Sequence, residues 1–418
     1  MTLSPRRQWT LFALGLTATI LNLVDRQIIA VLKPVIAADL GWSDNDYGTL
    51  AAWFQGSAAF AFLFTGWIAD RVGIKWANPL GVVSWSIAAI AHAWAWTMGQ
   101  FIFVRAALGA TEAMGTPTGI KTIATIFPVH LRSTAFGLSN ALGSVGAILA
   151  PLGIPFLAAL YGWRAAFVIA GAFGLVWAVA WMIAVRGLHF DDAPAGTGSA
   201  GLDAAPDYGP ILRDRRTWAI AVAKILSDAT WWLMLFWMPD FFNRQFGLSG
   251  TALGMPLAVA YAGAALGSLI AGSLATRFLA AGCPLNFVRK GAMLAAGMAV
   301  LPIPLALQTG ELWTATLILA LALAGHQAFS TTLFAVISDV TPAAKVGRVT
   351  SFGAFSGNLG GMAITKIAGL VLTAGLGYLP LFLFASLSYL LALGWIHLLL
   401  PVIRSAGGGA PGAAAGAH

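Results

Sequence analysis

The sequence predicts an all-α polytopic membrane protein in which twelve transmembrane helices form two pseudo-symmetric six-helix halves. Three observations lead to this fold class. Hydrophobic residues make up 59% of the 418 residues and charged residues only 9%, whereas about a quarter of a soluble domain is charged; the mean hydropathy is +0.82. Long apolar segments recur along the whole chain. Two short motifs recur at about half its length.

The apolar segments are long enough to cross a bilayer, which takes about 20 residues of helix. The first segment runs from about Trp9 to Leu32 and continues the pattern of the others, so we expect no cleavable signal peptide. We place the twelve spans around residues 21, 57, 86, 110, 146, 175, 229, 264, 299, 323, 360 and 388.

Basic residues between the spans gather on one side of the predicted membrane, and only Lys33, Arg164 and Arg244 fall on the other side. The larger group comprises Arg6, Arg7, Arg71, Lys75, Lys121, Arg132, Arg186, Arg213, Arg215, Arg216, Arg277, Arg289, Lys290, Lys345, Arg348 and Arg404. Because basic loops stay in the cytoplasm, we expect both termini there, in a bacterial inner (cytoplasmic) membrane. The bilayer therefore accounts for the net charge of +8, and we expect no nucleic-acid partner.

Two motifs of the first half recur in the second. Gly66-Trp-Ile-Ala-Asp70-Arg71 after span two returns as Gly272-Ser-Leu-Ala-Thr276-Arg277 after span eight. Arg132-Ser-Thr-Ala-Phe136-Gly137 before span five returns as Arg348-Val-Thr-Ser-Phe352-Gly353 before span eleven. A parallel repeat of this kind brackets a binding site near the midplane in many secondary transporters.

The repeat and the composition together predict the division of the chain. Residues 1–188 form the N-terminal six-helix half and residues 213–404 the C-terminal half. Residues 189–212 are polar and rich in Gly, Pro and Ala, which predicts a flexible cytoplasmic linker. Residues 405–418 are low-complexity sequence and are expected to form a disordered tail.

Charged residues inside the first half's spans are the strongest functional signal. Asp25 and Arg26 lie side by side in span one, where a charge costs at least about 2.5–3.5 kcal/mol, so they must face a bundle interior. Arg105 and Glu112 in span four are seven residues apart, which places them on one helical face about 10 Å apart. The guanidinium groups can bind a carboxylate, and the two carboxylates can exchange protons. The alternatives are a structural ion pair in span one and a fixed brace in span four.

Span seven of the second half carries Lys224, Asp228, Trp231 and Trp232. Lys224 and Asp228 can pair along the helix at i and i+4, and this local pair is as consistent with the sequence as a direct substrate role for Lys224. Either tryptophan could stack on the apolar face of a sugar ring or anchor the helix at the membrane interface.

Spans ten and eleven add polar side chains near mid-membrane. By the repeat offset, His326 and Gln327 fall within a turn of the counterpart of Glu112. They could contact substrate, or His326 could simply bond a neighbouring helix. Asn358 is neutral and suited to a hydroxyl, whereas Lys366, about two turns on, could extend toward the extracellular interface.

The loop after span two carries a family signature. GxxxDRxGxK, filled by Gly66, Asp70, Arg71, Gly73 and Lys75, resembles the signature of the major facilitator superfamily, and the twelve-span layout in two halves resembles its fold. We expect Asp70, Arg71 and Arg132 to make charge contacts between helix ends that latch one conformation.

Shorter motifs resemble the anion:cation symporter family within that superfamily. They are Leu-Asn-Leu-Val-Asp25-Arg26, Arg105 with Gly-Ala-Thr-Glu112-Ala, Gly162-Trp163-Arg164-Ala-Ala-Phe167 and, for its hexuronate-transporter branch, Ala324-Gly325-His326-Gln327-Ala328 with Ser338-Asp339-Val340. The resemblance implies proton-coupled symport of an organic anion by alternating access. It implies Asp25 and Glu112 as proton-handling carboxylates and Arg26 and Arg105 as anion-side arginines. Thr276 and Lys366 depart from the pattern.

The expected substrate is a hexuronate or related sugar acid. Arg26 supplies a fork for one carboxylate, while Gln327, Asn358 and His326 supply groups for hydroxyls. The stretch Ala150-Pro151-Leu-Gly153-Ile-Pro155 departs from the GPxxGG element of exporters in the superfamily, which favours uptake. A small mono- or aromatic carboxylate is the alternative substrate, and a non-transporting receptor on the same body is the alternative class.

The sequence gives no support for an enzyme. The single Cys283 excludes an internal disulfide and a multi-cysteine metal site, and the six His residues show no metal-binding spacing such as HExxH. We therefore expect no metal and no cofactor. The expected partners are a small organic anion, protons and the lipid bilayer, with the protein functioning as a monomer.

Overall fold

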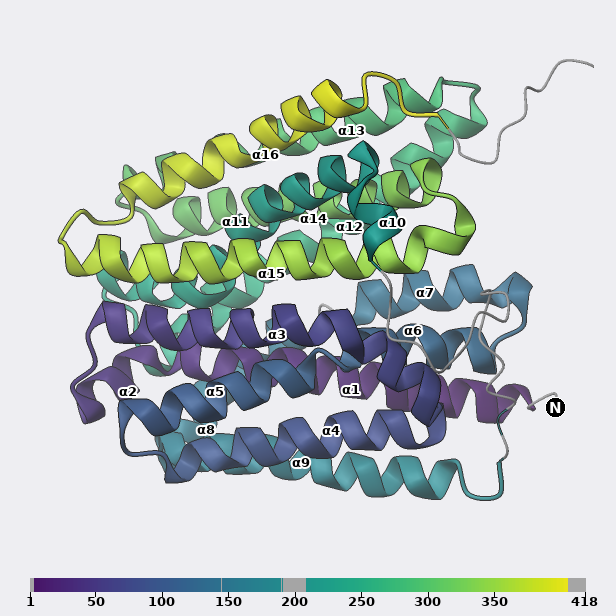
Figure 1. Cartoon of the computed structure of the whole chain (residues 1–418). Coiled ribbons are helices and arrows are strands. Elements are labelled where there is room, and N and C mark those ends of the chain that lie inside the picture. The colour runs from purple at the N-terminus through teal and green to yellow at the C-terminus, as the bar shows by residue number, and fades with distance from the viewer. Residues whose placement is uncertain (1–3, 144, 189, 191–207, 405–418) are drawn as a thin grey trace, which may run out of the picture.

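The helices form two bundles that lie one against the other, with all long axes running in roughly the same direction (Figure 1). The structure is a computed structural model that describes residues 4–143, 145–188, 190 and 208–404. The N-terminus lies at the right of Figure 1, and we call this side the terminal face. At the left, on the opposite face, lie α2 (Lys33–Leu40) and the turn between α15 (Ala343–Thr373) and α16 (Leu379–Leu399). The predicted tail, residues 405–418, lies outside the described residues.

The N-terminal bundle contains helices α1 to α9 and the 3₁₀ helix η1. Their bounds are α1 Pro5–Val31, α2 Lys33–Leu40, α3 Asp44–Val72, α4 Ile74–Ala91, η1 His92–Trp94, α5 Met98–Glu112, α6 Gly115–Ile126, α7 Val129–Gly143, α8 Val145–Tyr161 and α9 Trp163–Ala184.

The C-terminal bundle contains helices α11 to α16, preceded by the short α10. Their bounds are α10 Gly209–Leu212, α11 Arg215–Phe246, η2 Gly250–Leu253, α12 Gly254–Ala280, α13 Leu285–Val300, η3 Ile303–Leu307, α14 Leu312–Val340, α15 Ala343–Thr373 and α16 Leu379–Leu399. Most of the predicted linker, 189 and 191–207, lies outside the described residues. At its end, the Tyr208 hydroxyl donates to the Leu63 carbonyl at 3.1 Å.

The predicted twelve-span fold is confirmed in the described part of the chain. Eight helical segments there are long and apolar enough to cross a membrane by length and composition. The other four spans are α3, α4, the pair α5–α6 and the pair α7–α8, which are shorter, more polar or interrupted. Each of the twelve predicted centres falls inside a helix of the expected span.

Span four is interrupted directly after Glu112, the last residue of α5. Pro117 has no N–H to donate to the carbonyl of Ala113, so the regular ladder fails here. At the same break, the Asn22 side chain donates to the carbonyl of Glu112 at 3.5 Å. The helix dipole disfavours a negative charge at this terminus, so the Glu112 carboxylate needs a nearby cation.

Two glycines of the sequence motifs make the sharp turns between adjacent spans. Gly73 has φ 76° and alone separates α3 from α4, while Gly162 has φ 83° and alone separates α8 from α9. Residues with a Cβ rarely adopt these angles. The motif glycines therefore set the antiparallel packing of neighbouring helices.

The two halves approach most closely where α3 meets α15, near the opposite face. A Cβ on Gly48 would lie 2.8 Å from the Thr365 carbonyl oxygen, and a Cβ on Gly369 would lie 2.7 Å from that of Asp44. Glycine at both positions lets the backbones touch. Farther along the same helices, the Phe60 and Phe355 rings pack edge to face at 5.6 Å.

Candidate functional site at the interface of the halves

A buried ion pair links spans one and four of the N-terminal half. Arg26 Nε donates to Glu112 Oε2 at 2.6 Å, with the Glu112 side chain fully buried and that of Arg26 15% exposed. Asp25 is also buried and lies within electrostatic range of Glu112, Arg105 and Arg26. The structure thus brings together four of the predicted site residues, two carboxylates and two guanidinium groups.

Arg105 is the cation of this group that has no hydrogen-bond partner in the described chain. Its guanidinium is fully buried, and none of its nitrogens finds an acceptor. It lies over the Phe54 ring at 4.6 Å and at 6.0 Å from Phe236 of the C-terminal half. Cation–π contact compensates a buried guanidinium only in part, so Arg105 can still accept an anion.

Arg26 also reaches the C-terminal half. Its guanidinium carbon lies 5.6 Å from the centre of the Trp232 ring and 5.7 Å from that of Phe54. Trp232 in turn stacks on Phe236 at 5.9 Å. The charged group therefore lies at the interface of the two halves rather than inside one bundle.

The C-terminal half contributes a second ion pair and an aromatic stack. Lys224 Nζ lies 2.6 Å from Asp228 Oδ2, so the predicted i, i+4 pair is formed. His326 Nδ1 lies 2.7 Å from the Tyr389 hydroxyl, and the Trp231 ring stacks on His326 at 4.9 Å. His326 is thus fixed between two aromatic residues, and one face of Trp231 is already covered.

The two predicted amides differ in their contacts. Asn358 is buried and its Nδ2 donates to the Ala354 carbonyl one turn back at 2.8 Å. That bond engages only the NH2 group, which leaves the amide oxygen as an acceptor. Gln327 is half-buried.

Sequence reasoning missed two buried amides of the N-terminal half. Gln27 and Gln55 are fully buried, and neither amide has a hydrogen-bond partner in the described chain. The signal that could have indicated them is their place inside the apolar spans one and two, because a polar side chain buried in a span is costly and calls for an explanation.

The predicted latch residues lie on the terminal face. Asp70 Oδ1 lies 3.3 Å from Lys121 Nζ, which also donates to the Ala69 carbonyl. Arg132 Nε donates to the Phe127 carbonyl at 3.0 Å, and Arg71 lies over the Trp67 ring at 5.7 Å. Lys121 is therefore a partner that the sequence analysis did not assign to this group.

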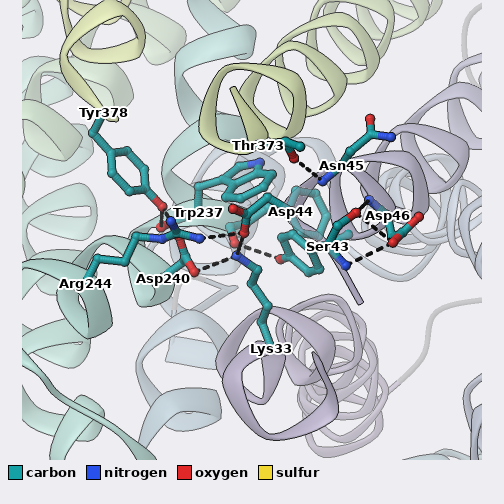
Figure 2. A network of polar contacts seen from close by, with 12 residues as sticks. Lys33, Ser43, Asp44, Asn45, Asp46, Trp237, Asp240, Arg244, Thr373 and Tyr378 are labelled. Carbon is teal, nitrogen blue, oxygen red and sulfur yellow. Dashed lines mark hydrogen bonds and ion pairs between the residues drawn. The ribbon is translucent and has the colours of Figure 1, made fainter. Parts of the chain in front are cut away.

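A second charged cluster, which the sequence analysis did not predict, joins the halves at the opposite face (Figure 2). Lys33 Nζ lies 2.7 Å from Asp44 Oδ1 and 2.5 Å from Asp240 Oδ1. Arg244 contacts the same two carboxylates, at 2.6 Å from Asp44 and 2.7 Å from Asp240. The Tyr378 hydroxyl donates to Asp240 Oδ2 at 2.5 Å. We call Lys33, Asp44, Asp240 and Arg244 the charge square.

Each half contributes one cation and one carboxylate to the charge square. Lys33 and Asp44 belong to the N-terminal half, and Asp240 and Arg244 to the C-terminal half. Each cation therefore binds one carboxylate of its own half and one of the other. Pro34 explains the placement of Lys33, because it interrupts the helix between α1 and α2 and turns the chain toward α11.

A further pair on the opposite face belongs to one half only. Arg164 Nη1 lies 3.1 Å from Asp39 Oδ2, and the Trp163 indole donates to the same oxygen at 3.0 Å. These two donors lower the pKa of the Asp39 carboxyl from its ordinary value. Arg164 itself lies between the Trp96 and Trp163 rings at 3.9 and 4.1 Å.

Twelve spans in two halves, with a buried cluster of charges between the halves, define a membrane transporter of the kind built from repeated six-helix units. The family model of the Major Facilitator Superfamily matches residues 15–365, and the chain belongs to that superfamily.

Three relatives indicate which branch of the superfamily the chain resembles. The hexuronate transporter of Escherichia coli (strain K12) is 28% identical over 389 residues, covering 90% of each chain. The D-galactonate transporter of Escherichia coli O6:H1 is 26% identical, covering 93% of this chain and 96% of that one. The galacturonate transporter of Dickeya chrysanthemi is 27% identical over 59% of this chain and 75% of its own. The predicted resemblance to a hexuronate-transporter-like branch is confirmed.

A solved structure shows the same fold. The bacterial homolog of the human lysosomal transporter Spinster, described as inward-facing and occupied, has a TM-score of 0.75 with 19% identity. It covers 97% of this chain and is itself covered completely. At this identity the similarity concerns the fold alone.

Proposed function

We propose that the protein is a proton-coupled symporter that takes up an organic anion, a hexuronate or related sugar acid, by alternating access. The observation that carries this proposal is the buried contact between Arg26 and Glu112. Arg26 is a fork-shaped donor at the interface of the halves, and a carboxylate of the protein itself holds it.

Competition between two carboxylates for Arg26 would couple anion binding to protonation. A substrate carboxylate and the Glu112 carboxylate compete for the same guanidinium, and a proton on Glu112 removes the charge that holds Arg26. Protonation of Glu112 thus favours anion binding at Arg26, and by reciprocity anion binding favours the proton. Asp25, buried beside the pair, is the second carboxylate that can take part.

The charge balance of the site also favours the uptake of one proton together with each anion. Asp25 and Glu112 balance Arg26 and Arg105, and Lys224 balances Asp228. A monoanion would leave this neutral group with one uncompensated negative charge, which is costly to bury. One proton taken up with each monoanion restores neutrality and makes the transport cycle electroneutral.

The polar and aromatic groups of the C-terminal half suit a polyol more than a simple acid. Asn358, Gln327 and His326 offer hydrogen-bonding groups, and Trp231, half-buried, offers one ring face. A site built to hydrogen-bond hydroxyls rejects analogues that lack them, because its polar groups are left unpaired. The named relatives transport hexuronate, galactonate and galacturonate, which points to the same substrate class.

The contacts between the halves support an inward-facing state within this proposal. With basic loops in the cytoplasm, the terminal face is cytoplasmic and the opposite face extracellular. The charge square and the α3–α15 contact then close the extracellular side.

Uptake into proteoliposomes tests the proposal. With an inward proton gradient, the wild-type protein should accumulate glucuronate or galacturonate, and either should compete with the other while lactate and benzoate do not. Glu112→Gln and Asp25→Asn should each abolish uphill accumulation, while at least one of them keeps exchange of internal for external substrate, since exchange need not return an empty carrier.

Three results would contradict parts of this proposal. Uptake of lactate or benzoate without response to any sugar acid would indicate a small-carboxylate symporter. Unchanged, pH-dependent accumulation in both carboxylate variants would remove the proton-coupling role of Asp25 and Glu112. Saturable binding without any transport would indicate a receptor.

A further inference from the structure

Lys366 differs from the other bases near the opposite face in its partners. Lys33 and Arg244 each bind two carboxylates, and Arg164 binds Asp39. Lys366 Nζ instead donates to two neutral oxygens, Asn45 Oδ1 at 2.5 Å and Thr49 Oγ1 at 2.7 Å. Among the described residues it makes no ion pair.

Both acceptors of Lys366 belong to the other half. Lys366 lies on α15 of the C-terminal half, whereas Asn45 and Thr49 lie on the first turns of α3 in the N-terminal half. The Asn45 backbone N–H donates to Thr373 Oγ1 across the same contact at 3.0 Å. The ammonium therefore keeps its hydrogen bonds only while α3 and α15 are in contact.

Separation of the halves at this face would affect the two kinds of cation differently. The charge square would divide into Lys33 with Asp44 on one half and Arg244 with Asp240 on the other, so that each cation keeps a carboxylate. Arg164 would keep Asp39, which belongs to its own half. Lys366 would lose both acceptors and keep its full charge. Of these four bases in the described chain, only Lys366 would then face the opening without a counter-ion.

We propose that Lys366 is an extracellular capture site for the carboxylate of the incoming anion. This inference rests on the proposed function, because it requires that the opposite face be extracellular and that it open. An unpaired ammonium with three donors attracts a carboxylate over a distance of about a Debye length, roughly 8 Å at physiological ionic strength. When the halves close again, Asn45 and Thr49 displace the carboxylate from Lys366 and the anion moves on to Arg26.

Lys366 would bind substrate that arrives from the extracellular side only. In the inward-facing state Lys366 is held by Asn45 and Thr49, so it cannot bind substrate that enters from the cytoplasm. The inference therefore predicts an asymmetric effect on KM. A residue that only held α3 against α15 would change the conformational equilibrium and affect both directions.

The test compares Lys366→Gln with Lys366→Arg. Uptake of galacturonate into intact cells reports the KM for external substrate, and uptake into inside-out vesicles reports the KM for cytoplasmic substrate. Lys366→Gln keeps an amide donor for Asn45 but loses the charge, and it should raise the external KM by about twofold to fivefold, the range of a partly screened ion pair. Its cytoplasmic KM should stay at the wild-type value. Lys366→Arg should keep the external KM near wild type.

Ionic strength and a matched variant complete the experiment. Raising salt should increase the external KM of the wild type and have a smaller effect in Lys366→Gln, because screening acts on the charge that the variant lacks. Arg164→Gln removes a positive charge from the same face, but one already paired with Asp39, and should leave both KM values unchanged.

Each failure has a distinct signature. Wild-type external KM and salt dependence in Lys366→Gln would overturn the capture site while leaving the proposed function intact. An equal rise in both KM values for Lys366→Gln would show that Lys366 acts only by holding α3 against α15. Absence of saturable uptake by the wild type would overturn the proposed function and this inference with it.

Discussion

Glu112 contacts Arg26 in the way that we propose for a substrate carboxylate, and the geometry of that contact is specific to a guanidinium. The bond runs from Nε at 2.6 Å, while Arg26 also lies over the Phe54 and Trp232 rings. The planar group can thus hold an anion at its edge and aromatic rings at its faces. A lysine ammonium has the same charge but neither the fork nor the flat face.

Arg26→Lys should therefore be severe despite conserving charge. Loss of one hydrogen bond between charged partners is worth about 1.5–3 kcal/mol, which corresponds to a roughly 10- to 150-fold loss in apparent affinity for the proposed sugar-acid substrate. Measurement of kcat/KM for galacturonate uptake checks this. The matched control is Lys224→Arg in the second ion pair, where charge alone should suffice and the change should be small. Wild-type kcat/KM in Arg26→Lys would show that Arg26 acts as a point charge.

Single residues also show what the sequence could and could not predict. The charged residues Asp25, Arg26, Arg105 and Glu112 were predictable because any charge in an apolar span demands an explanation. The hydrogen bond that fixes His326 could not be predicted, because its partner Tyr389 lies 63 residues away on another helix. Aromatic and hydroxyl side chains are common in spans, so only the three-dimensional contact distinguishes a partner from a lipid-facing residue.

At the scale of elements, apolar length predicted the spans but not their interruptions. The helix break after Glu112 and the short helix α2 (Lys33–Leu40) depend on Pro117 and Pro34, and a proline in a span indicates a kink without fixing where the chain then points. The charge square was missed for a related reason. Lys33 and Asp240 are 207 residues apart, and no local pattern joins them.

Packing of α3 on α15 gives a prediction about the closed state. A Cβ at Gly48 would lie 2.8 Å from the Thr365 oxygen and 3.0 Å from Gly369 Cα, and backbone atoms cannot yield as a side chain can. Gly48→Ala should destabilise this contact by about 1–3 kcal/mol, typical of overpacking, and so favour the state in which the opposite face is open.

Thiol accessibility measures that shift. Thr365 is fully buried in the contact, so Thr365→Cys in a Cys283→Ser background reports its opening. Gly48→Ala should accelerate maleimide labelling of this cysteine roughly 5- to 150-fold, the factor that corresponds to the expected free energy. Gly347→Ala on the same helix α15 is the control, because a Cβ there meets nothing within 4 Å. Equal labelling rates in the two variants would show that α3 and α15 adjust without separating.

At the scale of the whole molecule, the distribution of charge separates two roles. Ion pairs within one half, such as Arg164 with Asp39 or Lys121 with Asp70, can persist through any movement of the halves as rigid bodies. The ion pairs between the halves in the described chain lie at the opposite face, where the charge square can divide without leaving any of its own charges unpaired. Under the proposed alternating access, separation of α3 from α15 would break hydrogen bonds there. Of the four described bases near this face, it would leave only Lys366 without a counter-ion.

The orientation of the molecule decides which side that lysine serves, and the single thiol can establish it. Cys283 lies in the turn between α12 and α13 on the terminal face and is half-buried. Arg277, Arg289 and Lys290 flank it, and such basic clusters stay in the cytoplasm. A membrane-impermeant maleimide should therefore leave Cys283 unlabelled in intact cells and label it after permeabilisation. Thr251→Cys in a Cys283→Ser background, exposed at the opposite face, should show the reverse accessibility and be labelled in intact cells. Efficient labelling of Cys283 in intact cells would invert the orientation, so that Lys366 would face the cytoplasm and could capture only substrate leaving the cell.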